Sequence, residues 1–198
     1  MDMRAISPPI SDLVFRELKP TAIHGCFEIV PHIHSDARGR FVKTFHAGWF
    51  ESHGLRTDFV EQYYSVSHRR VLRGLHFQKP PAQHAKLVYC SDGAVLDAVV
   101  DVRPASPSFG KHILRELAAD SANMLYLPEG TAHGFYVLSE TATLMYAVTS
   151  AYAPECDGGI RWDSAGIEWP DNDPIVSERD QQLPTFAEGS GIFQDVNS

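Results

Sequence analysis

The sequence contains little cysteine, and nothing in it pairs the cysteines that are present. Cys26, Cys90 and Cys156 are widely spaced and odd in number, and no two of them form a Cys-x-x-Cys pair. Neither a disulfide framework nor a zinc knuckle is therefore expected. Such cysteines are typical of a reducing compartment, so we predict a cytoplasmic protein.

Long apolar runs and an excess of positive charge are also missing. The N-terminal stretch MDMRAISPPISDLVF is too polar for a signal peptide or a membrane span, so no membrane partner is expected. The 17 Lys and Arg residues against 25 Asp and Glu residues give a formal net charge of −8. This balance argues against a nucleic-acid partner, but it is compatible with a local basic pocket for a phosphorylated ligand.

What the sequence does contain is a series of short β-rich runs separated by turn residues. Its 198 residues are near the usual size of one domain. We predict a single domain over residues 1–198, with a partly irregular lead-in over 1–20 and a loose tail over 187–198, in which Ile192 and Phe193 could dock. Strands are expected at 41–45, 71–77, 86–90, 94–102, 112–117, 124–127, 134–138 and 143–149.

Local signals refine this pattern into a fold class. Asp92-Gly93 lies between two of the runs and predicts a β-hairpin. The run AVLDAVVDV (94–102) alternates only loosely, as expected for a strand buried on most sides. A short helix is expected near 49–53, and a second one could lie near the C-terminus. Many short strands with few helices predict an all-β antiparallel sandwich, jelly roll or barrel.

Two blocks of residues carry most of the chemical signal. The first is RGLHFQ (73–78), followed by KLV (86–88) and closed by Gly93. The second is PEGTAHGF (128–135). Together they resemble the paired motifs of the cupin superfamily, in which His-x-His and a Glu precede a Gly, and Pro-x-Gly-x-x-His follows. This resemblance implies a jelly-roll barrel with a few short helices.

The first motif departs from that of the metal-binding cupins. His76 stands at the first ligand position, but Gln78 replaces the second histidine and Lys86 replaces the carboxylate. A lysine ammonium has no lone pair and repels a divalent cation, so we predict that no metal is bound. Alone, His76, His133, Arg73 and Lys86 could each be an ordinary buried or rim residue. If they converge on one cavity, an anionic ligand such as a phosphate would offset their charge.

Several further segments make a more specific match. In order, they are VLRGLHFQ (71–78), KLVYC (86–90), AVLDAVVDVRPASPSFG (94–110), LPEGTAHGF (127–135), LMYAVTSAYAP (144–154), GGIRWD (158–163) and IEWP (167–170). They resemble the dTDP-4-dehydrorhamnose 3,5-epimerase family over about residues 36–184. The resemblance implies epimerisation of a nucleotide-linked 4-keto-6-deoxy sugar in deoxysugar or lipopolysaccharide biosynthesis, without a cofactor.

The resemblance also assigns catalytic roles. His76 matches the base that removes the proton beside the ketone, and Asp180 matches its acidic partner. Tyr146 matches the proton donor on the opposite face, and Lys86 matches the cation that stabilises the enolate oxygen. Without the resemblance, Asp180 would be read as an exposed residue and Tyr146 as a core aromatic.

The remaining matched residues hold the substrate or its surroundings. Arg38 lies on an N-terminal strand that crosses to the partner subunit in this family, so the resemblance implies a homodimer with sites completed across the interface. The residues matched to binding the nucleotide-diphosphate sugar are Arg38, Arg73, His133, Asp157 and Arg179.

The chain departs from the family pattern at the nucleotide end. The family has Gln-Asp-Asn where this chain has Glu61-Gln62-Tyr63, and a glutamate where it has Lys43. Lys43 and Glu61 suit the N3 acceptor and the amino donor of cytosine, so a CDP-sugar is a rival to a dTDP-sugar. Alternatively, these two residues pair with each other. Glu61, Tyr63 and Lys43 are therefore candidate substrate-binding residues.

Three other functions remain open. The first is a metal-dependent cupin oxygenase or isomerase, which Gln78 and Lys86 argue against. The second is a non-catalytic sugar-nucleotide binding module, which would be expected to lack one member of the catalytic set. The third is an epimerase that acts at C3 alone or at C5 alone.

Overall fold

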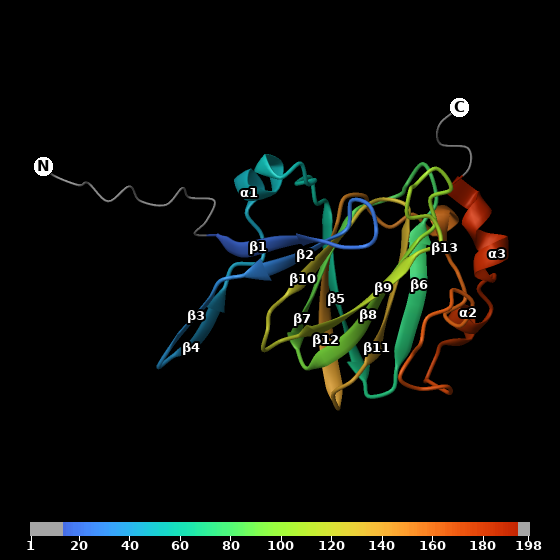
Figure 1. Ribbon diagram of the computed structural model, residues 1–198. Coiled ribbons are helices and arrows are strands. Elements are labelled where there is room, and N and C mark those ends of the chain that lie inside the picture. The colour runs from blue at the N-terminus through green and yellow to red at the C-terminus, as the bar shows by residue number, and fades with distance from the viewer. Residues whose placement is uncertain (1–13, 194–198) are drawn as a thin grey trace, which may run out of the picture.

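The structure is a computed structural model, and it describes residues 14–193. Within these residues, a six-stranded and a five-stranded antiparallel sheet face each other (Figure 1). The strand order is β1-β2-β10-β7-β12-β5 in the first sheet and β13-β6-β11-β8-β9 in the second, and β3 and β4 form a separate hairpin. The predicted all-β class is confirmed. No helix in this part of the chain is long and apolar enough to cross a membrane.

Most elements follow one another with short connections, but a long irregular segment over residues 160–177 joins β13 to α2. The strands are β1 (Phe15–Pro20), β2 (Phe27–Pro31), β3 (Ile33–Asp36), β4 (Gly39–Val42), β5 (Glu61–His68), β6 (Leu72–Gln78), β7 (Lys86–Asp92), β8 (Ala94–Asp101), β9 (His112–Ala118), β10 (Met124–Leu127), β11 (Thr131–Val137), β12 (Thr141–Val148) and β13 (Asp157–Gly159). The helices are α1 (Ala47–Ser52), η2 (Pro154–Cys156), α2 (Glu178–Gln181), α3 (Phe186–Gly189) and η3 (Ser190–Phe193).

The main core lies between the two sheets. Val88 and Leu144 of the six-stranded sheet pack in one buried cluster with Val99 and Phe135 of the five-stranded sheet. The outer faces are covered as well. Helix α1 contributes to a cluster with Leu87 and Met124, and the C-terminal segment packs on Leu75, Phe77 and Val100. Strands such as β8 are thus buried on both faces, which explains their loose alternation.

The Asp-Gly hairpin prediction is wrong. β7 pairs with β10 and β12, whereas β8 pairs with β9 and β11, so the turn at Asp92-Gly93 carries the chain from one sheet to the other. Gly93 has a φ of 74°, and a Cβ there would collide with the Thr141 carbonyl oxygen. The turn chemistry was therefore identified correctly, but the pairing partner was not.

The two ends of the chain are more regular than the sequence suggests. Residues 15–20, predicted to be part of an irregular lead-in, form β1 and pair with β2. Part of the predicted loose tail forms α3 and η3, and Phe193 packs edge-on against Phe77 at 5.3 Å. Residues 1–13 and 194–198 lie outside the described part. Each predicted strand overlaps an observed one, and the helix predicted near 49–53 is α1.

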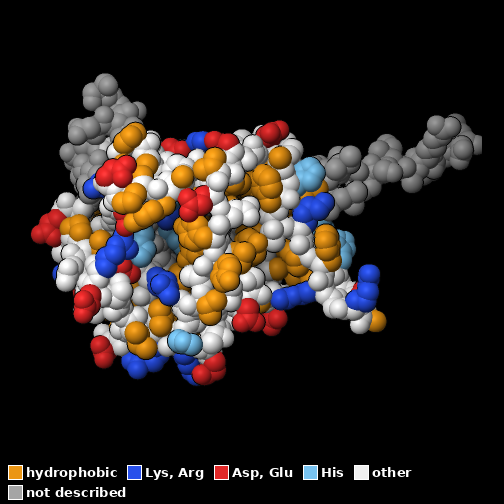
Figure 2. Space-filling view, turned by 180° about the vertical axis from the view of Figure 1, so that it is seen from behind, with side chains coloured by type: hydrophobic (Ala, Val, Ile, Leu, Met, Phe, Trp, Pro, Cys, Tyr) orange, Lys and Arg blue, Asp and Glu red, His pale blue; other side chains and the backbone are white. Residues whose placement is uncertain are grey.

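The β3–β4 hairpin stands away from the rest of the protein (Figure 1). Its residues are almost all exposed, including Phe41 at 62% and Ile33 at 39%. Figure 2 shows the hairpin projecting from the body, with hydrophobic side chains spread over the adjoining face. Arg38, at the tip, donates to Asp36 within the hairpin.

Candidate active site

Residues from five strands line a cavity of about 210 Å³ between the sheets. Side chains alternate along a strand, so Lys86 faces the interior with Val88, and Tyr146 faces it with Leu144. The cavity therefore lies next to the apolar core, between the same two sheets. It is lined by Tyr63, Ser65, Arg73, His76, Lys86, His133, Gly134, Phe135 and Tyr146.

His76 and Asp180 form a hydrogen-bonded pair at one side of this cavity. His76 Nε2 lies 2.8 Å from Asp180 Oδ1, and the Gly74 N–H donates to Asp180 Oδ2 at 3.0 Å. Ser177 caps α2 by accepting from the Asp180 N–H, which fixes the carboxylate at the start of that helix. Because a carboxylate only accepts, the hydrogen bond places a proton on Nε2, so the neutral tautomer of this imidazole has its lone pair on Nδ1.

Asp180 is kept ionised by its neighbours. Burial alone would raise the pKa of this carboxyl. The hydrogen bond and charge of His76, the Gly74 N–H and the Arg179 guanidinium outweigh burial and hold the pKa below its ordinary value. The pair is therefore a histidine oriented by a negative carboxylate, the arrangement that strengthens a histidine base.

Arg179 bridges this pair to Asp157. Its Nη1 lies 3.1 Å from His76 Nε2 and 3.3 Å from Asp180 Oδ1, and its Nη2 lies 2.5 Å from Asp157 Oδ2. A guanidinium has only donors, so Arg179 and His76 share the Asp180 oxygen. The structure thus places Arg179 and Asp157, both expected to hold substrate, beside His76.

Lys86 is buried in the cavity with one protein hydrogen bond. Its Nζ donates to the His76 carbonyl oxygen at 3.2 Å, and the residue is 6% exposed. Burial lowers the pKa of Lys86 to about 8, and the charges of Asp97 and Asp157 partly oppose that shift. A weakly solvated ammonium that still carries its proton near neutral pH is suited to stabilise a nearby oxyanion.

Asp97 is a site residue that the sequence analysis missed. It is fully buried on β8, and its Oδ2 lies 2.7 Å from His133 Nε2. Its Oδ1 is buried and has no hydrogen-bond partner among residues 14–193. Burial raises its pKa, although His133 and Lys86 act in the opposite direction. Asp97 does not itself line the cavity, but through His133 it places an acidic group next to the cationic side chains there. The available signal was an aspartate between apolar neighbours in the run 94–102, which also contains Asp101 near its end.

Tyr146 lies between two aromatic neighbours. Tyr63 stacks on it with ring centroids 4.7 Å apart and planes at 18°, and His133 meets it edge-on at 5.9 Å. Burial raises the pKa of the Tyr146 hydroxyl, so it stays protonated at neutral pH. A neutral phenol facing the cavity can donate a proton.

Some predicted residues lie outside the cavity. Arg38 is on the projecting hairpin, and Lys43 is exposed just beyond β4. Glu61 begins β5 and accepts from the backbone N–H of Tyr152 at 2.8 Å. Within residues 14–193, Lys43 and Glu61 form no ion pair, so the alternative in which they neutralise each other is wrong. Tyr152, which the sequence analysis did not select, lies beside both Glu61 and Asp157.

Gln78, at the second ligand position of the cupin motif, forms hydrogen bonds with two loops through its side-chain amide. Its Nε2 donates to the carbonyl oxygens of Ala82 and Ala151, and its Oε1 accepts from the Ala153 N–H. The amide and the Lys86 ammonium are poor substitutes for a histidine and a carboxylate. This donor set does not fit a divalent metal.

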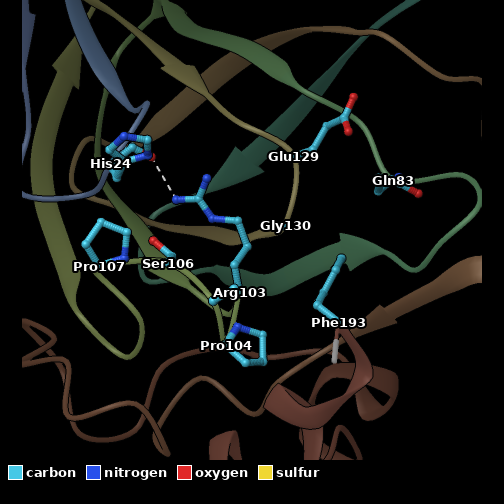
Figure 3. Close-up of a pocket in the computed structure, with 10 residues that line it drawn as sticks. His24, Gln83, Arg103, Pro104, Ser106, Pro107, Glu129, Gly130 and Phe193 are labelled. Carbon is cyan, nitrogen blue, oxygen red and sulfur yellow. Dashed lines mark hydrogen bonds between the residues drawn. The ribbon is translucent and has the colours of Figure 1, made fainter. Parts of the chain in front are cut away.

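A second cavity, of about 360 Å³, lies among the loops that follow β8 and β10 (Figure 3). Arg103 projects into it, but its guanidinium is engaged by Asp101 at 2.8 Å and by the His24 carbonyl oxygen at 2.7 Å. Glu129 is likewise paired with Arg56 at 2.7 Å. The guanidinium of Arg103 and the carboxylate of Glu129 are thus both paired within the protein.

Fold and site together define a cupin-fold enzyme whose central cavity is equipped to move protons. A family model described as dTDP-4-dehydrorhamnose 3,5-epimerase matches residues 20–188. The dTDP-4-dehydrorhamnose 3,5-epimerase of Escherichia coli K12 is 41% identical over 172 residues, which cover 85% of this chain and 93% of the relative. The dTDP-4-dehydrorhamnose 3-epimerase of Streptomyces niveus is 38% identical over 174 residues, with coverages of 86% and 84%.

Solved structures agree. The crystal structure of dTDP-4-dehydrorhamnose 3,5-epimerase from Elizabethkingia anophelis NUHP1 superposes with a TM-score of 0.83 at 40% identity, covering 88% of this chain and 98% of that chain. The chain belongs to the dTDP-4-dehydrorhamnose 3,5-epimerase family and is a carbohydrate epimerase.

Proposed function

We propose that the protein inverts C3 and C5 of a nucleotide-linked 4-keto-6-deoxyhexose by proton transfer through an enolate, in deoxysugar biosynthesis. The observation that carries this proposal is the meeting of His76, Lys86 and Tyr146 in one cavity. Hydrogens at C3 and C5 are acidic because the C4 carbonyl can take up the negative charge. The reaction therefore needs a base, a stabilised oxyanion and an acid.

Each need has a candidate group. His76 Nδ1 removes the proton, and Asp180 stabilises the imidazolium that results. The Lys86 ammonium binds the developing enolate oxygen. Tyr146 then gives its hydroxyl proton to the same carbon from the other face, which inverts the centre. Solvent returns a proton to Tyr146 and takes one from His76, so no cofactor is consumed.

Cationic side chains support a diphosphate at the rim. Arg73 donates from Nε to Ser67 at 2.9 Å, and this contact leaves the Nη atoms of its exposed guanidinium for an anion. Arg179 and Arg73 line the same surface depression next to His76. A bidentate guanidinium is well matched to phosphate oxygens. We infer that these two arginines bind the diphosphate of the substrate.

We propose dTDP as the nucleotide, because the relatives are named for dTDP-sugars. A CDP-sugar stays the rival, because Lys43 and Glu61 are not paired with each other, and the Tyr152 N–H contacts only one of the two carboxylate oxygens of Glu61. Titrating the inactive His76→Ala protein with dTDP and with CDP separates the two. Clear preference for CDP would reverse the assignment.

We further propose that the protein is a cytoplasmic homodimer in which the β3–β4 hairpin packs on the partner. The support is the exposure of Phe41 and Ile33 on a hairpin that lies outside both sheets. Burying such side chains against a second copy would recover their hydrophobic free energy. Arg38 would then reach the partner's site rather than its own.

The function is tested by incubating the protein with dTDP- and CDP-linked 4-keto-6-deoxyglucose in D2O and following both sugar carbons by NMR. Deuterium at C3 and C5 together with two inverted centres is the expected result. Deuterium at C3 alone would identify a C3 epimerase, the activity for which the Streptomyces niveus relative is named. No deuterium from either nucleotide sugar would rule out the proposal.

A further inference from the structure

We propose that Tyr63 is a positioning residue for the proton donor: its ring holds Tyr146 where the hydroxyl can reach the substrate carbon. The inference rests on the proposed function. It concerns the step after proton removal, in which the carbon is either inverted or returned to its original configuration. It concerns a side chain at which this chain departs from the family pattern.

The two tyrosines are brought together by strand register. Tyr63 on β5 and Tyr146 on β12 are direct partners in the antiparallel ladder, and both line the cavity. Directly opposed side chains on one face lie close enough for rings to interact. Their centroid distance of 4.7 Å and interplanar angle of 18° make an offset stack, which is one of the favoured geometries for aromatic pairs.

The stack controls the direction of the Tyr146 hydroxyl. A tyrosine side chain turns only about χ1 and χ2, so contacts on its ring determine where its oxygen lies. The His133 ring lies at 76° to the Tyr146 ring with centroids 5.9 Å apart, whereas the Tyr63 ring stacks on a face of Tyr146. His133 is itself held by the buried Asp97. Removing the Tyr63 ring would thus leave one side of Tyr146 open and allow the ring to tilt.

A displaced Tyr146 would have a specific chemical consequence. His76 would still remove the proton, and the enolate would still form beside Lys86. If Tyr146 no longer reaches the carbon, protonated His76 returns a proton from the original face. Exchange with solvent then continues, but the sugar keeps its original configuration. The ratio of inversion to exchange therefore reports the position of Tyr146 separately from the strength of the base.

The test measures this ratio in D2O for Tyr63→Ala and Tyr63→Phe. We expect Tyr63→Ala to lower the inversion-to-exchange ratio about 3- to 10-fold, as loss of an aromatic pair would predict. Tyr63→Phe keeps the stacked ring and should restore the wild-type ratio. The matched control is Tyr64→Ala, because Tyr64 is 65% exposed and its strand position faces away from the cavity.

The outcomes are distinct. A wild-type ratio in Tyr63→Ala, with exchange intact, would overturn the positioning role. An equal fall in Tyr63→Phe would also overturn it, because the phenol hydroxyl rather than the ring would then be responsible. Retained exchange shows in the same samples that the Ala variant is folded. If the wild-type protein neither exchanges nor inverts, the proposed function itself has failed.

Discussion

Replacing Lys86 by Met should stabilise the protein while it destroys the activity. The folded protein lowers the pKa of Lys86 from 10.5 to about 8, mainly because the ammonium is buried. Each pKa unit corresponds to about 1.4 kcal/mol, so keeping the charge in the folded state costs about 3 kcal/mol at pH 7. Methionine fills a similar volume without a charge.

The expected gain is smaller than that cost, because Asp97 loses a positive neighbour. We expect the free energy of unfolding of Lys86→Met to exceed that of the wild type by about 1–3 kcal/mol at pH 7. The gap should close as pH rises. Between pH 8 and 10.5 the folded wild type has lost the proton that the unfolded chain still binds, so wild-type stability increases with pH over that range.

Urea unfolding followed by circular dichroism at pH 7, 8, 9 and 10 measures this difference. Lys111→Met is the control, because Lys111 is exposed, and its effect should stay within about 0.5 kcal/mol at every pH. The reasoning is wrong if Lys86→Met is less stable than the wild type at pH 7. It is equally wrong if the gap does not change up to pH 10.

Four further results are expected. The wild-type kcat/KM should fall as pH rises through about 8, where Lys86 loses its proton, and a flat profile to pH 10 would contradict this. Asp180→Asn should lower kcat by about 10²- to 10⁴-fold in steady-state assays, because His76 loses the partner that orients it, and near-normal turnover would refute the pairing. Tyr146→Phe should keep deuterium exchange but lose inversion, and unchanged inversion would remove Tyr146 from its role. Phe41→Asp should elute from gel filtration as a smaller species than the wild type. An unchanged elution volume would contradict a dimer contact at the hairpin.

The sequence predicted most of the strands that bury apolar residues, but it missed the interior strand β2, which buries Ile29, and both edge strands of the six-stranded sheet. β1 (FRELKP) and β5 (EQYYSVSH) are mostly polar, so their pattern does not distinguish them from loops. Each is an edge strand whose formation depends on the neighbour with which it pairs. The Asp92-Gly93 turn failed differently: local chemistry identifies a turn, but the sheet that the next strand joins is decided by distant contacts.

The same distinction applies to the site. His76, Lys86 and His133 lie in compact motifs, and the alternation of their strands predicts that they face one cavity. Asp180 is 104 residues from His76, so only the family resemblance could join them. Asp97 was missed because a buried carboxylate is recognisable only when its partner is known. The Tyr63–Tyr146 contact depends on the register of two strands, which the sequence leaves open.

Because Gln78 bonds to two loops, replacing it by a metal-ligating histidine would have a structural cost. A histidine at position 78 would supply a ligand but would remove the hydrogen bonds from the Gln78 amide to Ala82, Ala151 and Ala153, and would leave the Ser150 hydroxyl bonded to the Ala82 carbonyl oxygen. Its new imidazole would also share the cavity with the Lys86 ammonium. Several simultaneous changes, each unfavourable alone, would be needed before a metal could bind. The Gln78 amide thus has a structural use at this position that a metal ligand would not supply.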